Sequence, residues 1–441
     1  MATEKETDNT KGDEVQQLPL PKQKWRPGVL SYIFVILVLL GGLAWGGVWL
    51  WTRSARQAFE AELASIKARG EATRFADYRP QGIAENDGTV HYQRALHGLE
   101  EFLRDETNPV AVNFNETTAR LQPPANTVVG VYTAEDLANI RLMMQQLAEA
   151  RRALSLSLDR KIRLDVDYNT YQGVNDAEQR DSATLRSWFR VLNAEGYLAI
   201  NDGDADRATT CIEDMLKLSA ARTNVTLVIN QFTNLAIGRG AVELNVSMIE
   251  HLPLSAEHRA RLDKQLSECE DLFRFAPAVQ ADRAALFELS GGFDAWINEL
   301  STDDVEFLDI DAVDAWLYAN LKAVRYNDFT TALQMMSRGI EFVDQPGPEG
   351  AAAAERFNQD MANLPGYLVM TGSWVSDIPS FREAGLRYRQ QLRGMRLALR
   401  VDAAIRDGRP PSNLHEVLDA TLPEVPPCMF WKHPLALRNT E

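Results

Sequence analysis

The chain has 441 residues, of which 45% are hydrophobic and 24% are charged, so it can form two or three domains or one elongated helical domain with a buried core. Its net charge is −16, and residues 1–28 contribute none of it because their five acidic and five basic side chains cancel. The acidic excess therefore lies further along the chain, where it would repel phosphate backbones, and we expect no nucleic acid partner.

An uncharged run of 23 residues, Val29–Trp51, follows a polar tail. Residues 1–28 lack periodicity, which predicts a disordered N-terminal tail. The run is long enough for a transmembrane helix, which needs about 20 residues. Aromatic residues typical of membrane interfaces lie near its two ends: Trp25, Tyr32, Trp45, Trp49 and Trp51. A cleaved signal peptide would have a shorter apolar core and a small-residue cleavage site, so we expect residues 29–51 to remain as the membrane anchor.

Basic residues around this run predict its orientation. Lys22, Lys24 and Arg26 precede the run, whereas Arg53 and Arg56 follow it. Because an excess of basic residues favours the cytoplasmic side of a membrane, we expect the N-terminus in the cytoplasm and the large C-terminal domain outside it.

The segment 52–130 is expected to be a juxtamembrane helix and loop region. Apolar residues recur at steps of three and four from Phe59 to Ile66, which predicts that the helix continues beyond the membrane. Gly70 is a stop signal, and the three prolines within 107–130 indicate a loop.

Helical patterns dominate the segment 131–343, and alternating apolar runs typical of strands are nearly absent. The patterns cover 134–160, 185–200, 205–221 and 227–249. Ser255 is expected to cap a further helix, with His258 three residues later in the position that a capping box usually gives to Glu. We therefore predict a mainly α protein in which an N-terminal transmembrane helix precedes an elongated α-helical domain.

The stretch LAINDGDADRATTCIEDML allows two interpretations. Asp202, Asp204, Asp206 and Glu213 have the spacing of the first, third, fifth and twelfth ligands of a calcium loop. However, Arg207 occupies the sixth position, where the sharp turn normally needs glycine, and its charge opposes a divalent cation. We therefore favour a turn between two helices, the second of which is capped by Asp204 or Asp206.

The residues around this turn follow a known helical pattern. Gly196 lies where a first helix must let a second one approach, Ala208 follows twelve residues later at the close contact, and Ile212 fills the next inward position. The segment resembles one tetratricopeptide-type hairpin, so 131–343 is expected to be a helical domain with such a hairpin. This kind of repeat needs stacked neighbours, and no second match occurs at a 34-residue step.

The remaining chain is expected to contain a linker and irregular segment, 344–380, and a C-terminal helix and turn, 381–441. DQPGPEG at Asp344–Gly350 is the strongest internal linker signal, and a long helix is expected over Phe381–Arg406.

The last 50 residues carry a second resemblance. The turn is formed by Asp407, Gly408, Arg409 and Pro411, and the short helix after it contains Leu414, Val417 and Leu418. This tail resembles that of type II secretion pseudopilins and of uncharacterised bacterial membrane-anchored proteins. Pro410 and Cys428-Met429-Phe430 depart from the pseudopilin pattern, and the short basic leader and the Glu of the apolar segment are missing. A pilus subunit is therefore not expected, and the resemblance implies no particular activity.

Three cysteines, Cys211, Cys269 and Cys428, are too few for a disulfide framework. Two buried thiols are the favoured interpretation of Cys211 and Cys269, with a disulfide between them as the alternative in an oxidising compartment. Cys428 and His433 could ligate a metal, but two residues have little specificity as a metal signal.

No recognisable catalytic motif occurs. The six histidines show no HExxH pattern, Gly372-Ser373-Trp374 lacks the glycines of a nucleophile elbow, and Gly238-Arg239-Gly240 indicates close helix packing. The acids of Asp303–Asp314 are interpreted as a solvated, helix-capping cluster. We therefore assign no catalytic, cofactor-binding or metal-ligating residue and expect no cofactor.

Three functional hypotheses remain. The first is a membrane-anchored extracytoplasmic helical scaffold that binds another protein, as stacked helical hairpins often do. The second is a secretion or envelope-assembly component that uses the pseudopilin-like tail. The third is a hydrolase without a recognisable motif, which would use acids such as Asp303, Asp304 and Asp309.

Overall fold

The computed structural model describes residues 27–79, 87–114, 118, 133–160, 162, 166–220, 227–291, 312–418 and 422. Within these ranges every regular element is a helix and no β-strand occurs, which confirms the predicted mainly α fold. Residues 1–26 of the expected disordered tail lie outside the described residues.

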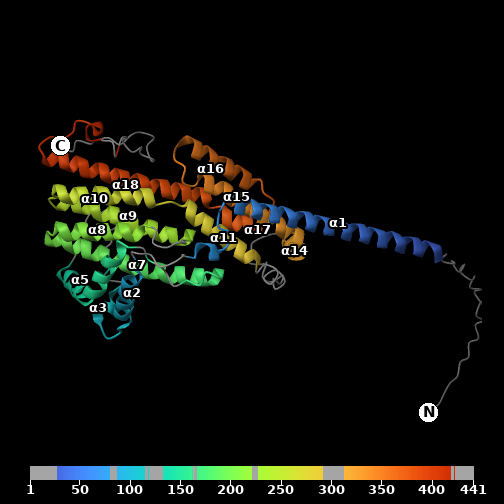
Figure 1. The fold of residues 1–441 in the computed structure, drawn as a ribbon, viewed down its shortest axis with the longest axis horizontal. Helices are drawn as coiled ribbons and strands as arrows, with labels where there is room; N and C mark the ends of the chain where they lie inside the picture. Colours follow the sequence, from blue (N-terminus) through green and yellow to red (C-terminus); the bar gives the residue numbers. More distant parts are fainter. Residues whose placement is uncertain are drawn as a thin grey trace, which may run out of the picture.

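The first helix, α1 (Pro27–Ala68), is continuous over 42 residues and ends before Gly70, which has a left-handed backbone with φ of 72°. Its N-terminal part extends away from the helical body (Figure 1), and its length and composition would let it cross a membrane. Its C-terminal part packs on α15 (Lys322–Phe342), where the ring centroids of Phe59 and Tyr326 lie 5.9 Å apart. The helix thus runs from the apolar segment into the core, as predicted.

Five long helices lie side by side along the long axis of the body (Figure 1). They are α7 (Tyr171–Asp202), α8 (Ala205–Ser219), α9 (Val228–His251), α10 (Ala256–Leu272) and α18 (Ile378–Arg406). The apolar residues of α9 surround its whole circumference, which explains why it lies between α7, α8 and α18.

The expected turn between two helices is confirmed. Gly203 ends α7 in a left-handed conformation with φ of 76°, and Asp204 caps α8 by accepting the Arg207 N–H at 3.0 Å. Gly196, which was expected to admit the second helix of the hairpin, instead faces α9, because a Cβ there would lie 2.3 Å from the side chain of Leu244. The α7–α8 hairpin remains compatible with the tetratricopeptide-type arrangement.

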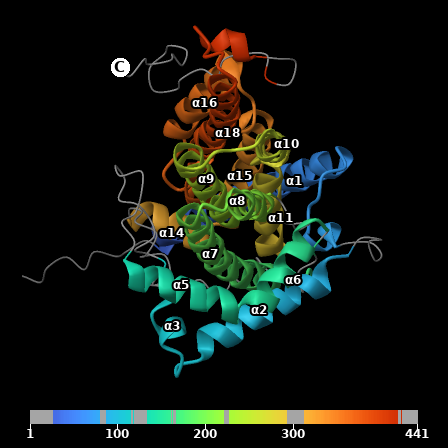
Figure 2. The ribbon, with the colours of Figure 1, turned by 90° about the vertical axis from the view of Figure 1, so that its left-hand side faces the viewer.

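A second layer crosses beneath α7 (Figure 2). It consists of α2 (Thr89–Arg104), α3 (Pro109–Val112), α5 (Ala134–Gln146) and α6 (Ala148–Leu158). The helical pattern over 134–160 is thus divided at Leu147, although Ile140, Leu147 and Leu154 are all buried on the inner side.

The end of the body nearest the apolar segment contains α11 (Ala276–Gly291), α14 (Ala312–Asn320), α15, α16 (Gly347–Ala362) and α17 (Val369–Val375). The segment 344–380 was expected to be irregular, but α16 and α17 occupy much of it. One apolar cluster runs from Ile66 to Leu399 and includes Phe357 and Val375 of these two helices. Residues 344–380 are therefore part of the packed body because their apolar side chains join its core.

Two short 3₁₀ helices complete the described chain, namely η1 (Phe75–Tyr78) and η3 (Leu414–Val417). The predicted turn after α18 is present, with Gly408 left-handed at φ of 71°. Leu414 packs with Leu397 and Leu422 in a small cluster of its own.

Candidate binding grooves

The acids that resemble a calcium loop each interact with a different group. Asp202 pairs with Arg141 at 2.6 Å, Asp206 with His258 at 2.7 Å and Glu213 with Arg261 at 2.6 Å, while Asp204 is the helix cap. Among the residues that the structure describes, no three His, Cys, Asp or Glu side chains are grouped so that they could hold a metal. Asp202, Asp206 and Glu213 therefore join helices to one another, and Asp204 stabilises the start of α8.

The cysteines Cys211 and Cys269 are both buried as free thiols, so the alternative of a disulfide between them is not realised. The Cys269 Sγ lies 3.3 Å from the hydroxyl of Tyr388 and 3.5 Å from that of Ser219. Burial raises the pKa of both thiols, which makes them inert as nucleophiles.

The glycines of Gly238-Arg239-Gly240 serve close packing, as predicted. A Cβ at Gly238 would lie 1.9 Å from the Tyr388 hydroxyl, and one at Gly240 would lie 2.3 Å from the ring of Phe189. Ser373 lies within the short helix α17. His258 completes the capping box of α10, since its N–H donates to the Ser255 hydroxyl at 3.1 Å and its Nδ1 accepts the Ser255 N–H at 3.3 Å.

Several acids and metal candidates named from the sequence lie outside the described residues: Asp303, Asp304, Asp309, Cys428 and His433. The hydrolase hypothesis built on the three acids therefore receives no support from the structure.

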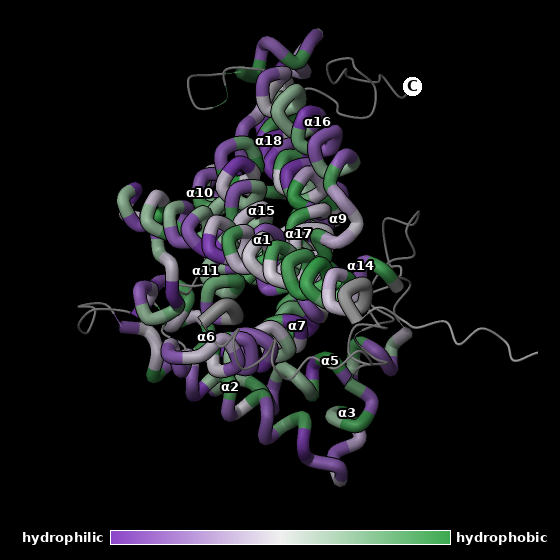
Figure 3. The backbone as a smooth tube through the Cα atoms, turned by 90° about the vertical axis from the view of Figure 1, so that its right-hand side faces the viewer, coloured by the Kyte–Doolittle hydropathy of each residue, from purple (hydrophilic) through white to green (hydrophobic). Residues whose placement is uncertain are grey.

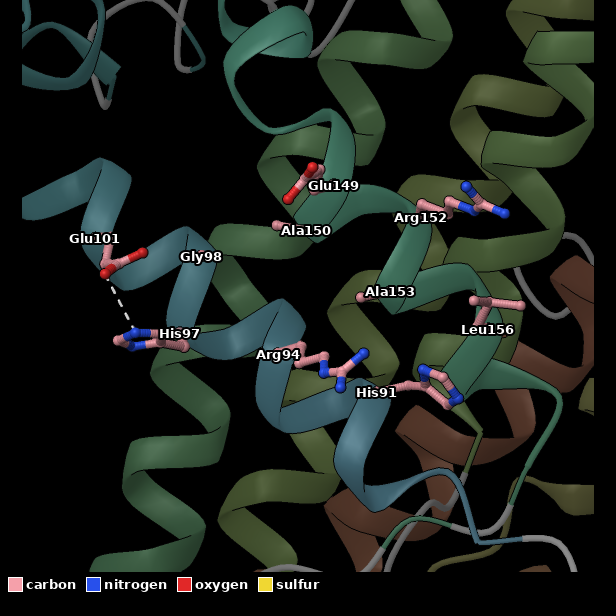
Figure 4. A pocket seen from close by; sticks show the side chains of 10 residues that line it. All are labelled: His91, Arg94, His97, Gly98, Glu101, Glu149, Ala150, Arg152, Ala153 and Leu156. Atoms are coloured by element: carbon pink, nitrogen blue, oxygen red, sulfur yellow. Dashed lines mark ion pairs between the residues drawn. The ribbon is translucent and has the colours of Figure 1, made fainter.

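One open groove lies between α2 and α6 and has a volume of about 510 Å³. The two helices approach closely there because Gly98 faces Ala150, whose Cβ would be 2.8 Å from a Cβ at Gly98. Figure 4 shows side chains of both signs along the groove, and His97 pairs with Glu101 at 3.2 Å. The charged and titratable lining residues are His91, Arg94, His97, Glu101, Glu149 and Arg152. This mixture selects neither an anionic nor a cationic ligand.

A larger groove, of about 790 Å³, lies between the middle of α7 and the N-terminal half of α9. Its apolar lining includes Phe189 of α7 together with Phe232 and Ile229 of α9. Ile229 is 66% exposed, which makes it the large apolar side chain of the groove that is most open to a partner. Arg186 and Arg190 line the α7 side, one helical turn apart.

Polar residues at the end of the α7–α9 groove hold its two helices together. Asn230 lies between α7 and α9, where its amide donates to Glu178 at 2.6 Å and its carbonyl oxygen accepts a hydrogen bond from the Ser182 hydroxyl. Glu178 also accepts the N–H of Leu227, the residue before α9, at 3.4 Å. The groove thus has a polar end that is already hydrogen-bonded, an apolar floor and a cationic wall.

No pattern in the sequence singles out the α7–α9 groove. Arg186, Phe189 and Arg190 have the spacing of one face of α7, but such a face could equally be solvated. Only the packing of α9 beside α7 adds the apolar side chains of a second helix, Ile229 and Phe232, to this face.

Comparison of the chain with models of protein families, with curated proteins and with solved structures found no match.

Proposed function

We propose that this protein is a membrane-anchored scaffold whose α7–α9 groove binds an acidic, amphipathic helix of a partner protein. The groove supports the proposal because it combines an exposed apolar floor with two arginines on one wall. Amphipathic helices bind such grooves through apolar residues spaced three and four apart. Since the chain as a whole carries a net charge of −16, a cationic groove provides local charge complementarity to an acidic partner.

The anchor in this proposal is the N-terminal half of α1. The apolar run 29–51 carries no charge, and most of its described side chains are exposed, as expected for groups that contact lipid. The basic residues before and after the run favour an extracytoplasmic body. Proteolysis of spheroplasts tests this orientation, with a tag at each end of the chain. Loss of the C-terminal tag with survival of the N-terminal tag supports it, and protection of the C-terminal tag until lysis overturns it.

The binding proposal can be tested in cells by photo-crosslinking from the groove. A benzophenone amino acid replaces Ile229 in the full-length chain, and the crosslinked segment of the partner is identified by mass spectrometry. We expect an acidic segment with apolar residues at helical spacing. The peptide from that segment is then made and its affinity for the purified chain in detergent is measured.

The decisive variant is Arg186→Glu/Arg190→Glu, which reverses the charge of the groove wall. We expect this double variant to weaken peptide binding at least tenfold, equivalent to about 1.4 kcal/mol, because it opposes acidic side chains with acidic ones. Arg94→Glu/Arg152→Glu reverses two charges in the α2–α6 groove and serves as the matched control. Equal affinities for the two double variants, or a basic crosslinked segment, would contradict the proposal.

A second candidate function is envelope assembly through the C-terminal tail. It is favoured by the turn at Gly408, followed by a short helix whose Leu414 packs against α18. Deletion of residues 407–441 tests it: loss of a complex with export machinery, with binding in the α7–α9 groove retained, would support this second function.

A further inference from the structure

The helix α14 has an exposed apolar face in addition to a buried one. Val313 and Trp316, three residues apart on one face, are 67% and 56% exposed. The opposite face is anchored in the body, where Tyr318 is buried and Asp314 lies against Gly366. A large exposed tryptophan on a helix whose opposite face packs on the body calls for a partner surface.

The position of α14 is set by α15, which runs parallel to α1. Phe59 lies beside Tyr326, with ring centroids 5.9 Å apart, and further along both helices Gln334 donates to Glu62 at 3.5 Å. The N-terminus of α15 therefore points toward the apolar part of α1, and α14 directly precedes it in the chain. Figures 1 and 3 both show α14 beside α1 at the end of the body from which α1 extends.

Helix geometry gives the distance to the membrane anchor. Lys322 begins α15 four residues before Tyr326, which is about 6 Å of helix. The corresponding point on α1, four residues before Phe59, is Ala55, and Trp51 at the end of the apolar run is only about 6 Å beyond it. The start of α15, which α14 directly precedes in the chain, thus lies within about one helical turn of the level at which the anchor would enter the lipid.

We propose that α14 lies on the membrane surface and inserts Trp316 and Val313 into the headgroup region beside the anchor. This inference rests on the proposed membrane anchoring of α1. Tryptophan suits the interface because its ring is apolar while its N–H can hydrogen-bond to water or headgroups. Exposed cationic residues lie at the same level, Arg53 on α1 and Lys322 at the start of α15, and they would attract anionic lipids. The contact would orient the body relative to the bilayer.

The test measures nitroxide accessibility in the full-length protein, reconstituted in vesicles of phosphatidylcholine with about one quarter phosphatidylglycerol. Single labels are attached to Trp316→Cys, to Val90→Cys on α2 and to Leu40→Cys in the apolar run, in a Cys428→Ser chain whose other two cysteines are buried. Val90 is a matched control because it is an apolar residue that is 58% exposed on a different helix. Oxygen partitions into lipid and a nickel chelate stays in water, so their collision rates with the label report its depth.

We expect the ratio of oxygen collisions to nickel-chelate collisions to be higher for the label at 316 than for the label at 90. The same ratio should be lower at 316 than at 40, because the headgroup region is shallower than the bilayer core. A label at 316 that is as aqueous as the one at 90, while the label at 40 reports the bilayer core, would overturn this inference alone. An aqueous label at 40 would overturn the anchoring as well. Spin–spin broadening at 316 that disappears when unlabelled chain is added would show a second copy covering α14, which also overturns the lipid contact.

Discussion

At the scale of single residues, two carboxylates within the packed body provide hydrogen-bond acceptors at the starts of helices. Asp282 accepts the Val228 N–H of α9 at 3.2 Å, and Asp328 accepts the Met370 and Thr371 N–H groups of α17 at 2.8 and 2.9 Å. Burial raises the pKa of Asp282 to about 7 and that of Asp328 to about 6, although these hydrogen bonds act to lower both.

This elevated pKa of Asp282 makes stability depend on pH. The folded protein holds the proton of Asp282 up to about pH 7, whereas the unfolded chain releases it near the ordinary value of 3.8. The contribution of protonated Asp282 to stability is therefore complete below about pH 4 and is lost as the pH rises through about 7. The raised pKa of Asp328 likewise makes stability fall as the pH rises.

We expect Asp282→Asn to raise the melting temperature above pH 7 and to change it little near pH 4, because the amide keeps an acceptor for Val228 without the cost of a buried charge. Thermal unfolding of the full-length chain in detergent from pH 4 to 8 measures this. Asp282→Ala, which loses the acceptor, should lower the melting temperature at acidic pH. A difference between wild type and Asp282→Asn that is the same at every pH would contradict the assignment.

Gly238 provides a second test at a single residue. Gly238→Ala would place a methyl group 1.9 Å from the Tyr388 hydroxyl, and we expect it to destabilise the fold by about 1–3 kcal/mol through overpacking. Gly394→Ala is the control, since nothing lies within 4 Å of a Cβ there, and it should stabilise α18 by about 0.5–1 kcal/mol. Urea unfolding compares the two; equal effects would contradict the close contact of α9 with α18.

At the scale of elements, helix starts depend on partners distant in the chain. The carboxylate of Asp344 accepts the N–H groups of Phe275 and Ala276 at 3.0 and 2.9 Å, so the connection between α15 and α16 caps α11. An aspartate in this position also suits the positive end of the helix dipole. The same few residues that resemble a linker therefore join two parts of the core.

Removal of this cap should weaken the start of α11. We expect Asp344→Ala to cost about 1–2 kcal/mol, typical of a lost N-terminal cap, and to speed amide hydrogen exchange at Phe275 and Ala276. Asp344→Asn keeps one acceptor, so its stability should lie between that of Asp344→Ala and that of the wild type. Unchanged exchange at both amides in Asp344→Ala would show that the helix start does not depend on this carboxylate.

At the scale of the whole molecule, α1 is both the candidate anchor and a helix of the body. Phe59 lies between Phe287 and Tyr326, with ring centroids 6.5 and 5.9 Å away, so α1 is held by both α11 and α15. Because the helix is continuous from Pro27, packing at Phe59 fixes the direction in which the apolar run leaves the body.

We expect Phe59→Ala to weaken the packing of α1 against α11 and α15. The distance distribution between spin labels at positions 40 and 90 of the reconstituted chain should then become broader. The half-buried ring should also contribute about 2 kcal/mol to stability, less than the 3–5 kcal/mol typical of a fully buried phenylalanine. Gln57→Ala, at an exposed position of the same helix, is the control. An unchanged distribution in Phe59→Ala would mean that other contacts of α1 suffice.

The sequence by itself determined the helical class, the long apolar run and the turn at Gly203. These features depend on local periodicity and on backbone preferences, which residues such as Gly203, Asp204 and Ser255 carry in their own neighbourhood. The close packing at Gly238 and Gly240 was predictable for the same reason, since only small side chains allow it.

Only the tertiary structure decided which helices meet and where a groove remains. Gly196 was expected to face α8 but faces Leu244 of α9, and Asp344 of the linker-like segment caps α11. The α7–α9 groove likewise arises from two helices that are separated in the chain by α8. Cap partners and groove walls come from contacts between distant segments, and the local pattern of a helix specifies that it has an apolar face without specifying its neighbour.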